Sequence, residues 1–237
     1  MKSLPNLSVL FPCYNDAGTI KGLVEQSLQT GKAITEDLEV IVVDDGSKDS
    51  SPRILSELSR SIPELRVFYH AENRGYGAAL RSGFRHASKD YIFYTDGDGQ
   101  YDVRELPLLV ESMGEGVDIV NGYKLNRSDP CYRSFIGGAY RGLMRWMFGI
   151  EIRDIDCDFR LFKRGLLDGI ELRSDSGAIC VEMLSKFQQR GVVFVEVMVH
   201  HYPRQYGSSQ FFTFRHVSRS ILGLIRLWWR LKILKKG

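Results

Sequence analysis

An apolar run ends in two carboxylates one residue apart in the stretch Tyr91-Ile92-Phe93-Tyr94-Thr95-Asp96-Gly97-Asp98-Gly99-Gln100. The run predicts a buried strand over Tyr91–Tyr94, which places the two carboxylates at its carboxyl end. Side chains two positions apart in an extended chain share a face, so Asp96 and Asp98 point the same way. With the amide oxygen of Gln100 they form a set of hard oxygen ligands suited to Mg²⁺ or Mn²⁺. A solvated acidic turn is the alternative.

The rest of the first half repeats this alternation of apolar runs and helix-like segments. Strands are predicted at Leu7–Phe11, Glu39–Val43, Arg66–Tyr69, Tyr91–Tyr94 and Asp118–Val120. Helices are predicted at about Thr19–Leu28, Ser51–Arg60, Gly75–Ala87 and Val103–Met113. In the less regular second half, a helix is predicted at Gly177–Arg190 and a strand at Val192–Val199. Apolar strands that alternate with helices predict an α/β fold, a mainly parallel sheet with helices on both faces.

Polar loops follow four of the predicted strands. They are Tyr14-Asn15-Asp16, Asp44-Asp45-Gly46-Ser47, Glu72-Asn73-Arg74-Gly75-Tyr76-Gly77 and Asp96-Gly97-Asp98-Gly99-Gln100. Parallel sheets bind ligands beyond the carboxyl ends of their strands, so four acidic loops at one edge predict a site that uses a cation. The chain has no Gly-x-Gly-x-x-Gly after its first strand and no Walker lysine loop, which argues against a dinucleotide oxidoreductase and a P-loop ATPase.

The charge of the chain is unevenly distributed. Its 237 residues carry a net charge of +3, with 43% hydrophobic and 26% charged residues, as in an ordinary globular protein. No Asp or Glu occurs from Val197 onward, so the C-terminal part holds more than the whole positive excess. The main body is therefore slightly acidic, which argues against nucleic acid as a partner.

The cysteines and the N-terminus indicate a cytoplasmic setting. Cys13, Cys131, Cys157 and Cys180 lie far apart and form no Cys-x-x-Cys, which favours reduced thiols over disulfides or a zinc site. The segment Met1–Asn6 lacks the apolar core of a signal peptide. No stretch reaches the roughly 18 to 20 apolar residues that a transmembrane helix needs, so the chain is predicted not to cross a membrane unaided.

Six motifs of the chain resemble those of a known family. They are Pro12-x-Tyr14-Asn15-Asp16, Val43-Asp44-Asp45-Gly46-Ser47-x-Asp49, Asn73-x-Gly75-x-Gly77-Ala78-Ala79, Asp96-x-Asp98-Gly99-Gln100, Asp154-x-x-x-Asp158-Phe159-Arg160-Leu161-Phe162 and Arg204-x-x-Gly207-x-Ser209. The first four resemble the family 2 inverting glycosyltransferases with the GT-A (Rossmann-like) fold. The last two resemble the dolichol-phosphate mannose synthase-like branch, which includes bacterial polyprenyl-phosphate glycosyltransferases. The match runs from about Leu7 to Phe211.

The resemblance implies a role for each matching residue. Base and ribose contacts are expected from Pro12, Tyr14, Asp16, Val43 and Asp45. Metal ligands are expected at Asp96, Asp98 and Gln100, and further donor contacts at Gly97, Lys124, Arg133 and Arg204. The cation, Mg²⁺ or Mn²⁺, would bridge the two phosphates of a nucleotide sugar and offset the charge of the leaving diphosphate.

Some of these roles have alternatives or depart from the family pattern. Asp44 and Asp45 could instead serve as helix-cap and turn residues, and Arg133 as a solvated or lipid-facing charge. Asp16 stands where the family usually has Glu. Lys124 and Gln210 replace an arginine and a lysine of the mannose synthases, which weakens the case for GDP-mannose as the donor.

The catalytic candidates are Asp158 and Arg204. A transfer to a hydroxyl would need a carboxylate base. A polyprenyl phosphate is already anionic and needs alignment more than a base, which leaves open whether Asp158 acts as base or only orients. We therefore expect inverting, metal-dependent transfer of a sugar from a nucleotide-diphosphate sugar to a polyprenyl phosphate of the dolichyl or undecaprenyl type. Alternatives are transfer to a glycan or lipid hydroxyl, and a catalytically silent scaffold that binds nucleotide sugars.

The chain divides into a predicted GT-A domain, residues 1–210, and a basic tail, residues 211–237. The tail places Arg215, Arg219, Arg226 and Arg230 on one face of a helix that also carries Leu, Ile and two Trp residues. Such a helix is predicted to lie on an anionic membrane surface. A helix packed on the domain and a dimer contact are the alternatives. The expected location is cytoplasmic, peripherally bound to the cytoplasmic face of a membrane; a homo-oligomer is left open.

Overall fold

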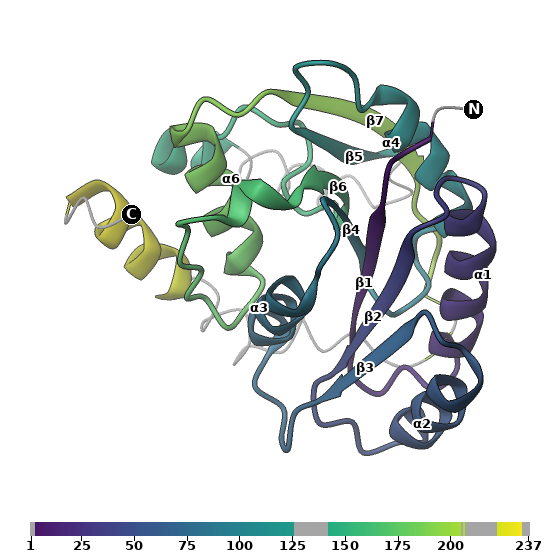
Figure 1. The fold of residues 1–237 in the computed structure, drawn as a ribbon. Coiled ribbons are helices and arrows are strands. Elements are labelled where there is room, and N and C mark those ends of the chain that lie inside the picture. The colour runs from purple at the N-terminus through teal and green to yellow at the C-terminus, as the bar shows by residue number, and fades with distance from the viewer. Residues whose placement is uncertain (1–2, 126–141, 205, 207–221, 234–237) are drawn as a thin grey trace.

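The computed structural model describes residues 3–125, 142–204, 206 and 222–233. A seven-stranded sheet in the order β3-β2-β1-β4-β6-β5-β7 forms its centre (Figure 1). The strands are β1 (Leu7–Cys13), β2 (Leu38–Asp44), β3 (Leu65–Tyr69), β4 (Tyr91–Thr95), β5 (Ile119–Leu125), β6 (Phe159–Lys163) and β7 (Phe194–His200). The helices include α1 (Ile20–Lys32), α2 (Ser51–Ser61), α3 (Tyr76–His86), α4 (Leu106–Ser112) and α6 (Ala178–Gln189), with the short 3-10 helices η1 (Val103–Glu105) and η2 (Arg164–Leu167) and the π-helix η3 (Trp229–Ile233).

The sheet is mainly parallel, which confirms the predicted α/β fold. Strands β1 to β4 run parallel to their neighbours, and β7 runs parallel to β5. Strand β6 lies antiparallel between β4 and β5. This strand was not among the predicted ones, because Arg160 interrupts its apolar run after the first residue. The predicted helix over Val103–Met113 is divided into η1 and α4, with a proline in the first turn of α4.

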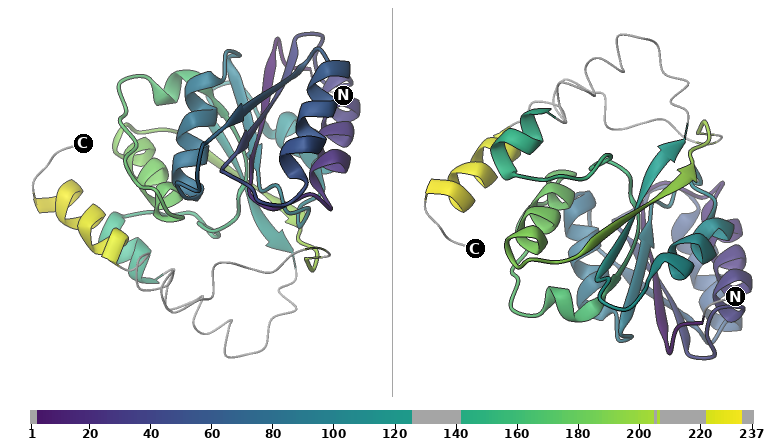
Figure 2. Two further views of the ribbon diagram at one scale, coloured as in Figure 1. Left: turned by 90° about the horizontal axis from the view of Figure 1, so that it is seen from below. Right: turned by 90° about the horizontal axis from the view of Figure 1, so that it is seen from above.

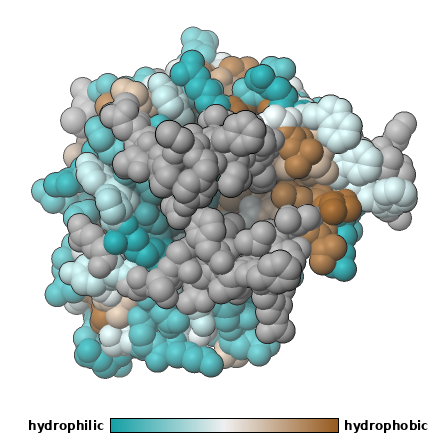
Figure 3. All heavy atoms as spheres, turned by 180° about the vertical axis from the view of Figure 1, so that it is seen from behind, coloured by the Kyte–Doolittle hydropathy of each residue, from teal (hydrophilic) through white to brown (hydrophobic). Residues whose placement is uncertain are grey.

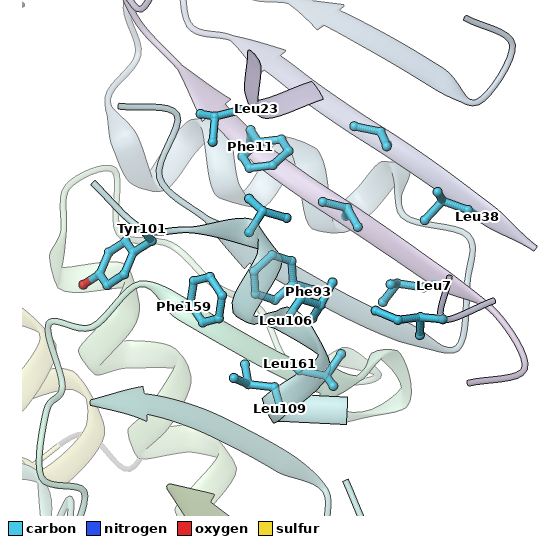
Figure 4. Packing of buried hydrophobic residues seen from close by; sticks show 14 of the residues in the cluster. Leu7, Phe11, Leu23, Leu38, Phe93, Tyr101, Leu106, Leu109, Phe159 and Leu161 are labelled. Atoms are coloured by element: carbon cyan, nitrogen blue, oxygen red, sulfur yellow. The ribbon is translucent and has the colours of Figure 1, made fainter. Parts of the chain in front are cut away.

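Both faces of the sheet are buried under helices. Strand β1 shows the alternation: Leu7, Val9 and Phe11 pack on the side of α1, α2 and α4, whereas Leu10 packs on the side of α3 and α6. Figure 4 shows the first of these clusters, in which Phe11, Phe93 and other apolar side chains interdigitate. With every residue of β1 and β2 buried, the two strands form a rigid base for the loops at their carboxyl ends.

The C-terminal helix packs against the α6 side of the domain. Residues 222–228 are helical and continue into η3 (Figure 2, yellow). Leu227 and Leu231 are buried in the same cluster as Met144, Phe148 and the residues of α6. The predicted tail therefore contributes to the core where it is described. No helix within the described ranges is both long and apolar enough to cross a bilayer.

Candidate active site

The loops after β1 and β4 touch at the carboxyl edge of the sheet. A β-carbon added at Gly97 would lie 2.6 Å from the carbonyl oxygen of Pro12 and 3.2 Å from Oδ2 of Asp16. Any side chain at position 97 would thus force the two loops apart. Oδ2 of Asp16 also accepts the backbone N–H of Tyr14 at 2.9 Å. The residues predicted around the donor from these two loops are therefore neighbours.

Four carboxylates, those of Asp16, Asp96, Asp98 and Asp158, gather at this edge. Asp96 is half-buried, and its removal from solvent, followed by the nearby charges of Asp158 and Asp98, raises its pKa well above the ordinary value. The hydroxyl of Tyr76 donates to Oδ1 of Asp96 at 2.8 Å. Burial and then the charge of Asp98 also raise the pKa of Asp16, to about 6. Mutually repelling carboxylates of this kind are suited to a divalent cation, which would offset their charge.

An arginine already holds one of the predicted metal ligands. Nη2 of Arg204 donates to Oδ2 of Asp98 at 2.5 Å, while Oδ1 accepts the backbone N–H of Gln100 at 3.0 Å. The side-chain amide of Gln100 donates to the carbonyl of Tyr202 at 3.0 Å, and the N–H of Tyr202 donates back to the carbonyl of Gln100 at 2.8 Å. In the described part of the chain, no group of three or more His, Cys, Asp or Glu residues is arranged to hold a metal. A cation at Asp98 would have to replace Arg204.

The catalytic candidate Asp158 lies beside this cluster, next to the start of β6. Its Oδ1 accepts from Nη1 of Arg160 and from the thiol of Cys180, each at 3.0 Å. Lys124 follows on the same side, with Nζ donating to the carbonyl of Asp156 at 3.2 Å, and its charge only partly opposes the rise in the pKa of Asp96. The structure thus brings Asp96, Asp98, Asp158, Lys124 and Arg204 together. Arg133 lies outside the described residues.

A cleft of about 650 Å³ opens between the loops after β1, β2 and β3. Tyr14, Asp44, Ser47 and Tyr69 are among the residues that line it. Asp44 is only 2% exposed, and its Oδ1 has no hydrogen-bond partner in the described structure. Its Oδ2 accepts the N–H of Ser47 at 3.3 Å. A buried carboxylate oxygen without a donor is costly, so a ligand that brings an N–H group would find a partner here.

The neighbouring Asp45 has a different environment. Its carboxylate accepts the backbone N–H groups of Arg74 and Gly75, at 3.0 and 2.8 Å, and lies 2.5 Å from Nδ1 of His70. Asp45 thereby ties the loop after β3 to that after β2. The side chain of Val43 is buried in the core on the α3 side. Nucleotide contacts of Asp45 and Val43 stay predictions, whereas Asp44 and Tyr69 line the cleft without having been among the predicted binding residues.

The chain matches one family model and several known proteins. The model of the glycosyl transferase family 2 domain matches residues 8–170. An undecaprenyl-phosphate 4-deoxy-4-formamido-L-arabinose transferase from Pectobacterium atrosepticum is 30% identical over 210 residues, covering 88% of this chain and 63% of that protein. The enzyme of that name from Proteus mirabilis is 28% identical over 212 residues, 89% of this chain and 64% of that protein. The chain thus spans just under two thirds of the length of these relatives.

The fold also matches solved structures. Glucosyl-3-phosphoglycerate synthase from Mycobacterium tuberculosis, in complex with phosphoglyceric acid, has a TM-score of 0.74 with 18% identity. The match covers 94% of this chain and 80% of that one. A complex of the same synthase with Mn²⁺, UDP and phosphoglyceric acid has a TM-score of 0.73, also at 18% identity, over 94% of this chain and 78% of that one. At this identity the likeness concerns the fold.

Proposed function

Because this chain belongs to glycosyl transferase family 2, we propose that it transfers a sugar from a nucleotide-diphosphate sugar to a polyprenyl phosphate, with inversion and with the help of a divalent cation. The observation that carries this proposal is the convergence of Asp96, Asp98, Asp158 and Arg204 beside the cleft at Asp44. The undecaprenyl-phosphate transferases named above support the choice of acceptor.

Different residues at the carboxyl edge are suited to the base, the cation and the phosphates of the donor. The unpartnered Oδ1 of Asp44 is suited to accept an N–H of the base, and Tyr69 offers an aromatic face in the same cleft. Asp96, Asp98 and Gln100 would hold the cation, which, when bound, offsets the charge of the diphosphate as it leaves. The Mn²⁺ and UDP found in the similar synthase support this use of the edge. Arg204 has the forked geometry that binds phosphate oxygens in pairs.

The acceptor side needs alignment more than proton transfer. A polyprenyl phosphate reaches the site already ionised, so the attacking oxygen does not require a base. Asp158 is held at the acceptor side of the acidic cluster by Arg160 and Cys180 and would orient the incoming group. In this proposal Asp158 and Arg204 are the residues closest to the reacting atoms.

A two-stage experiment tests the proposal. First, UDP-, GDP- and other nucleotide sugars are screened with Mn²⁺ by thermal shift, with Asp44→Asn as the variant that should lose the stabilisation by the preferred nucleotide. The preferred donor is then incubated with a short-chain polyprenyl phosphate, and the lipid-linked sugar and its anomeric configuration are determined. Product of inverted configuration is the expected result. Transfer only to free hydroxyl acceptors, or donor binding without any turnover, would contradict the proposal.

We further propose that the chain meets the membrane at the C-terminal helix. One side of this helix exposes Leu222, Ile225 and Trp229, the last with 54% of its surface accessible. The segment next to it exposes Leu143 and Trp146, the latter 78% accessible. Figure 3 shows apolar atoms gathered on this side of the molecule. Exposed Trp and aliphatic side chains next to basic residues are typical of helices at a lipid interface.

The basic residues of the helix differ in their surroundings. Arg226 is exposed, whereas Nη2 of Arg230 donates to the buried Glu182 on α6 at 2.5 Å. Arg230 therefore fastens the helix to the domain, and Arg226 is the described arginine of this helix that is available to anionic lipid. Arg215 and Arg219 lie outside the described residues.

Replacing both exposed tryptophans should weaken binding to vesicles. We expect Trp146→Ser with Trp229→Ser to reduce co-sedimentation with anionic vesicles at least about tenfold, because two aromatic side chains leave the interface. Arg226→Ala should cost about 1 kcal/mol and lower the salt dependence of binding. Leu108→Ser, an exposed apolar position on α4, serves as control. Unchanged sedimentation of the tryptophan double variant would show that this surface does not contact lipid.

A further inference from the structure

Arg160 is the largest fully buried side chain in the described structure. It lies on β6, the strand inserted between β4 and β5, and its exposure is 0%. Burying a guanidinium group is expensive unless each part of it is paired and hydrogen-bonded. The N–H groups of this buried guanidinium therefore need acceptors on neighbouring residues.

The guanidinium group donates hydrogen bonds to acceptors on two neighbouring strands and in the loop before β6. Its Nε donates to Oδ1 of Asn121 on β5, and its Nη2 donates to the carbonyl of Ile155 in the loop before β6. Its Nη1 donates to the hydroxyl of Tyr94 on β4 and, at 3.0 Å, to Oδ1 of Asp158. Arg160 thus joins two neighbouring strands to the loop that carries the catalytic candidate.

Three donors converge on one oxygen of Asp158. Besides Arg160, Oδ1 receives the thiol of Cys180 at 3.0 Å and the hydroxyl of Tyr94 at 3.4 Å. Among the described residues, the hydrogen bonds to Asp158 all go to Oδ1 and none goes to Oδ2, and the side chain is 16% exposed. A carboxylate held through one oxygen keeps a single orientation, so its other oxygen has a defined place in the site.

We propose that Arg160 is a positioning residue of the transfer reaction: it acts through Asp158, whose Oδ1 it fixes together with Tyr94 and Cys180, and so directs Oδ2 toward the acceptor. This inference rests on the proposed function, in which Asp158 orients the acceptor phosphate. Arg160 itself is enclosed and touches no substrate. Its contribution is the orientation of the carboxylate, and it should be visible in turnover and not in donor affinity.

A double-mutant cycle measures whether Arg160 and its partners act through Asp158. Tyr94→Phe removes one hydroxyl that contacts both Arg160 and Asp158, and we expect turnover to fall about tenfold with donor affinity unchanged. Arg160→Lys keeps the charge and loses the fork, so a larger fall, about 100-fold, is expected. In the Asp158→Asn background neither change should reduce turnover further. Tyr91→Phe, on the same strand but without a described contact to Asp158, is the matched control.

The outcomes separate positioning from a structural role. Thermal melting checks each variant, and Tyr94→Phe decides the matter if Arg160→Lys does not fold. The proposal would be overturned if Tyr94→Phe or Arg160→Lys lowered turnover equally in the parent protein and in the Asp158→Asn background. A loss confined to donor affinity would overturn it as well. Absence of transfer to polyprenyl phosphate by the parent protein contradicts the proposed function alone. The same cycle is then measured on Mn²⁺-dependent hydrolysis of the donor, where coupling supports positioning and additive losses overturn it.

Discussion

Chelation of divalent cations by EDTA should abolish sugar transfer, and added Mn²⁺ should restore it. Burial, and then the charges of Asp158 and Asp98, raise the pKa of Asp96, and a diphosphate would bring more negative charge to the same edge. Without a cation, the carboxylates would repel both the bound donor and the diphosphate that leaves. A metal contributes several kcal/mol of charge stabilisation in such reactions, so the loss should exceed about 100-fold.

The same prediction extends to the ligands. Asp98→Ala should lose the Mn²⁺-dependent part of nucleotide affinity and most of the turnover, since it removes a carboxylate of the cluster. Asp102→Asn is the control, because Asp102 lies in the same region but pairs with Arg104. Calorimetry of nucleotide binding with and without Mn²⁺ provides the measurement. Undiminished turnover of the parent protein in excess EDTA would show that the edge works without a metal.

Most of the sheet could be predicted because its strands are apolar throughout. The runs at Leu7–Phe11 and Glu39–Val43 became β1 and β2 with small extensions at their ends. Strand β6 was not predicted because an arginine at its second position breaks the apolar pattern on which strand prediction depends. That arginine is tolerated only because Asn121 and Tyr94, on neighbouring strands, and Asp158 satisfy it, and pairings across a sheet are not visible in a linear sequence.

The sequence was enough to predict which loops form the site, but not which side chain of each loop faces the ligand. The sequence identified the pair Asp44-Asp45, yet the structure gives the two residues opposite surroundings. Asp44 ends β2 and lines the cleft, whereas Asp45 binds the backbone of the loop after β3. Adjacent residues at a strand end point to different sides, and the exact end of the strand decides which one faces the ligand.

The contact between Arg204 and Asp98 lies beyond sequence reasoning for another reason. The two residues are 106 positions apart, and only the return of the chain after β7 brings them together. Each was predicted to bind a part of the donor, the arginine phosphate and the aspartate metal. In the structure the two residues bind each other. We therefore expect a cation at Asp98 and a phosphate at Arg204 to compete with this ion pair.

Removing Arg204 should for this reason change metal and donor binding in opposite directions. In Arg204→Ala, Asp98 loses its cationic partner, and we expect Mn²⁺ alone to bind more tightly than to the parent protein. The nucleotide sugar, measured in the presence of saturating Mn²⁺, should bind about 10- to 100-fold more weakly, because a charge-assisted hydrogen bond is worth roughly 1.5 to 3 kcal/mol. Arg204→Lys should recover only part of the donor affinity, since lysine lacks the paired geometry.

Calorimetric titrations with Mn²⁺ alone and with donor plus Mn²⁺ separate these two effects. Arg104→Ala removes an arginine that pairs with Asp102 and makes no described contact to Asp98, so it controls for the loss of positive charge as such. If Arg104→Ala tightened Mn²⁺ binding as much as Arg204→Ala, general electrostatics would explain the change and the direct contact would not matter. If Arg204→Ala left Mn²⁺ affinity unchanged but lowered donor affinity, Arg204 would bind the donor phosphate without competing with the metal for Asp98. Tighter Mn²⁺ binding together with weaker donor binding in Arg204→Ala, with neither change in Arg104→Ala, is the result that supports the proposal. It would identify Arg204 as a residue that the cation displaces from Asp98 and that then binds the donor phosphate.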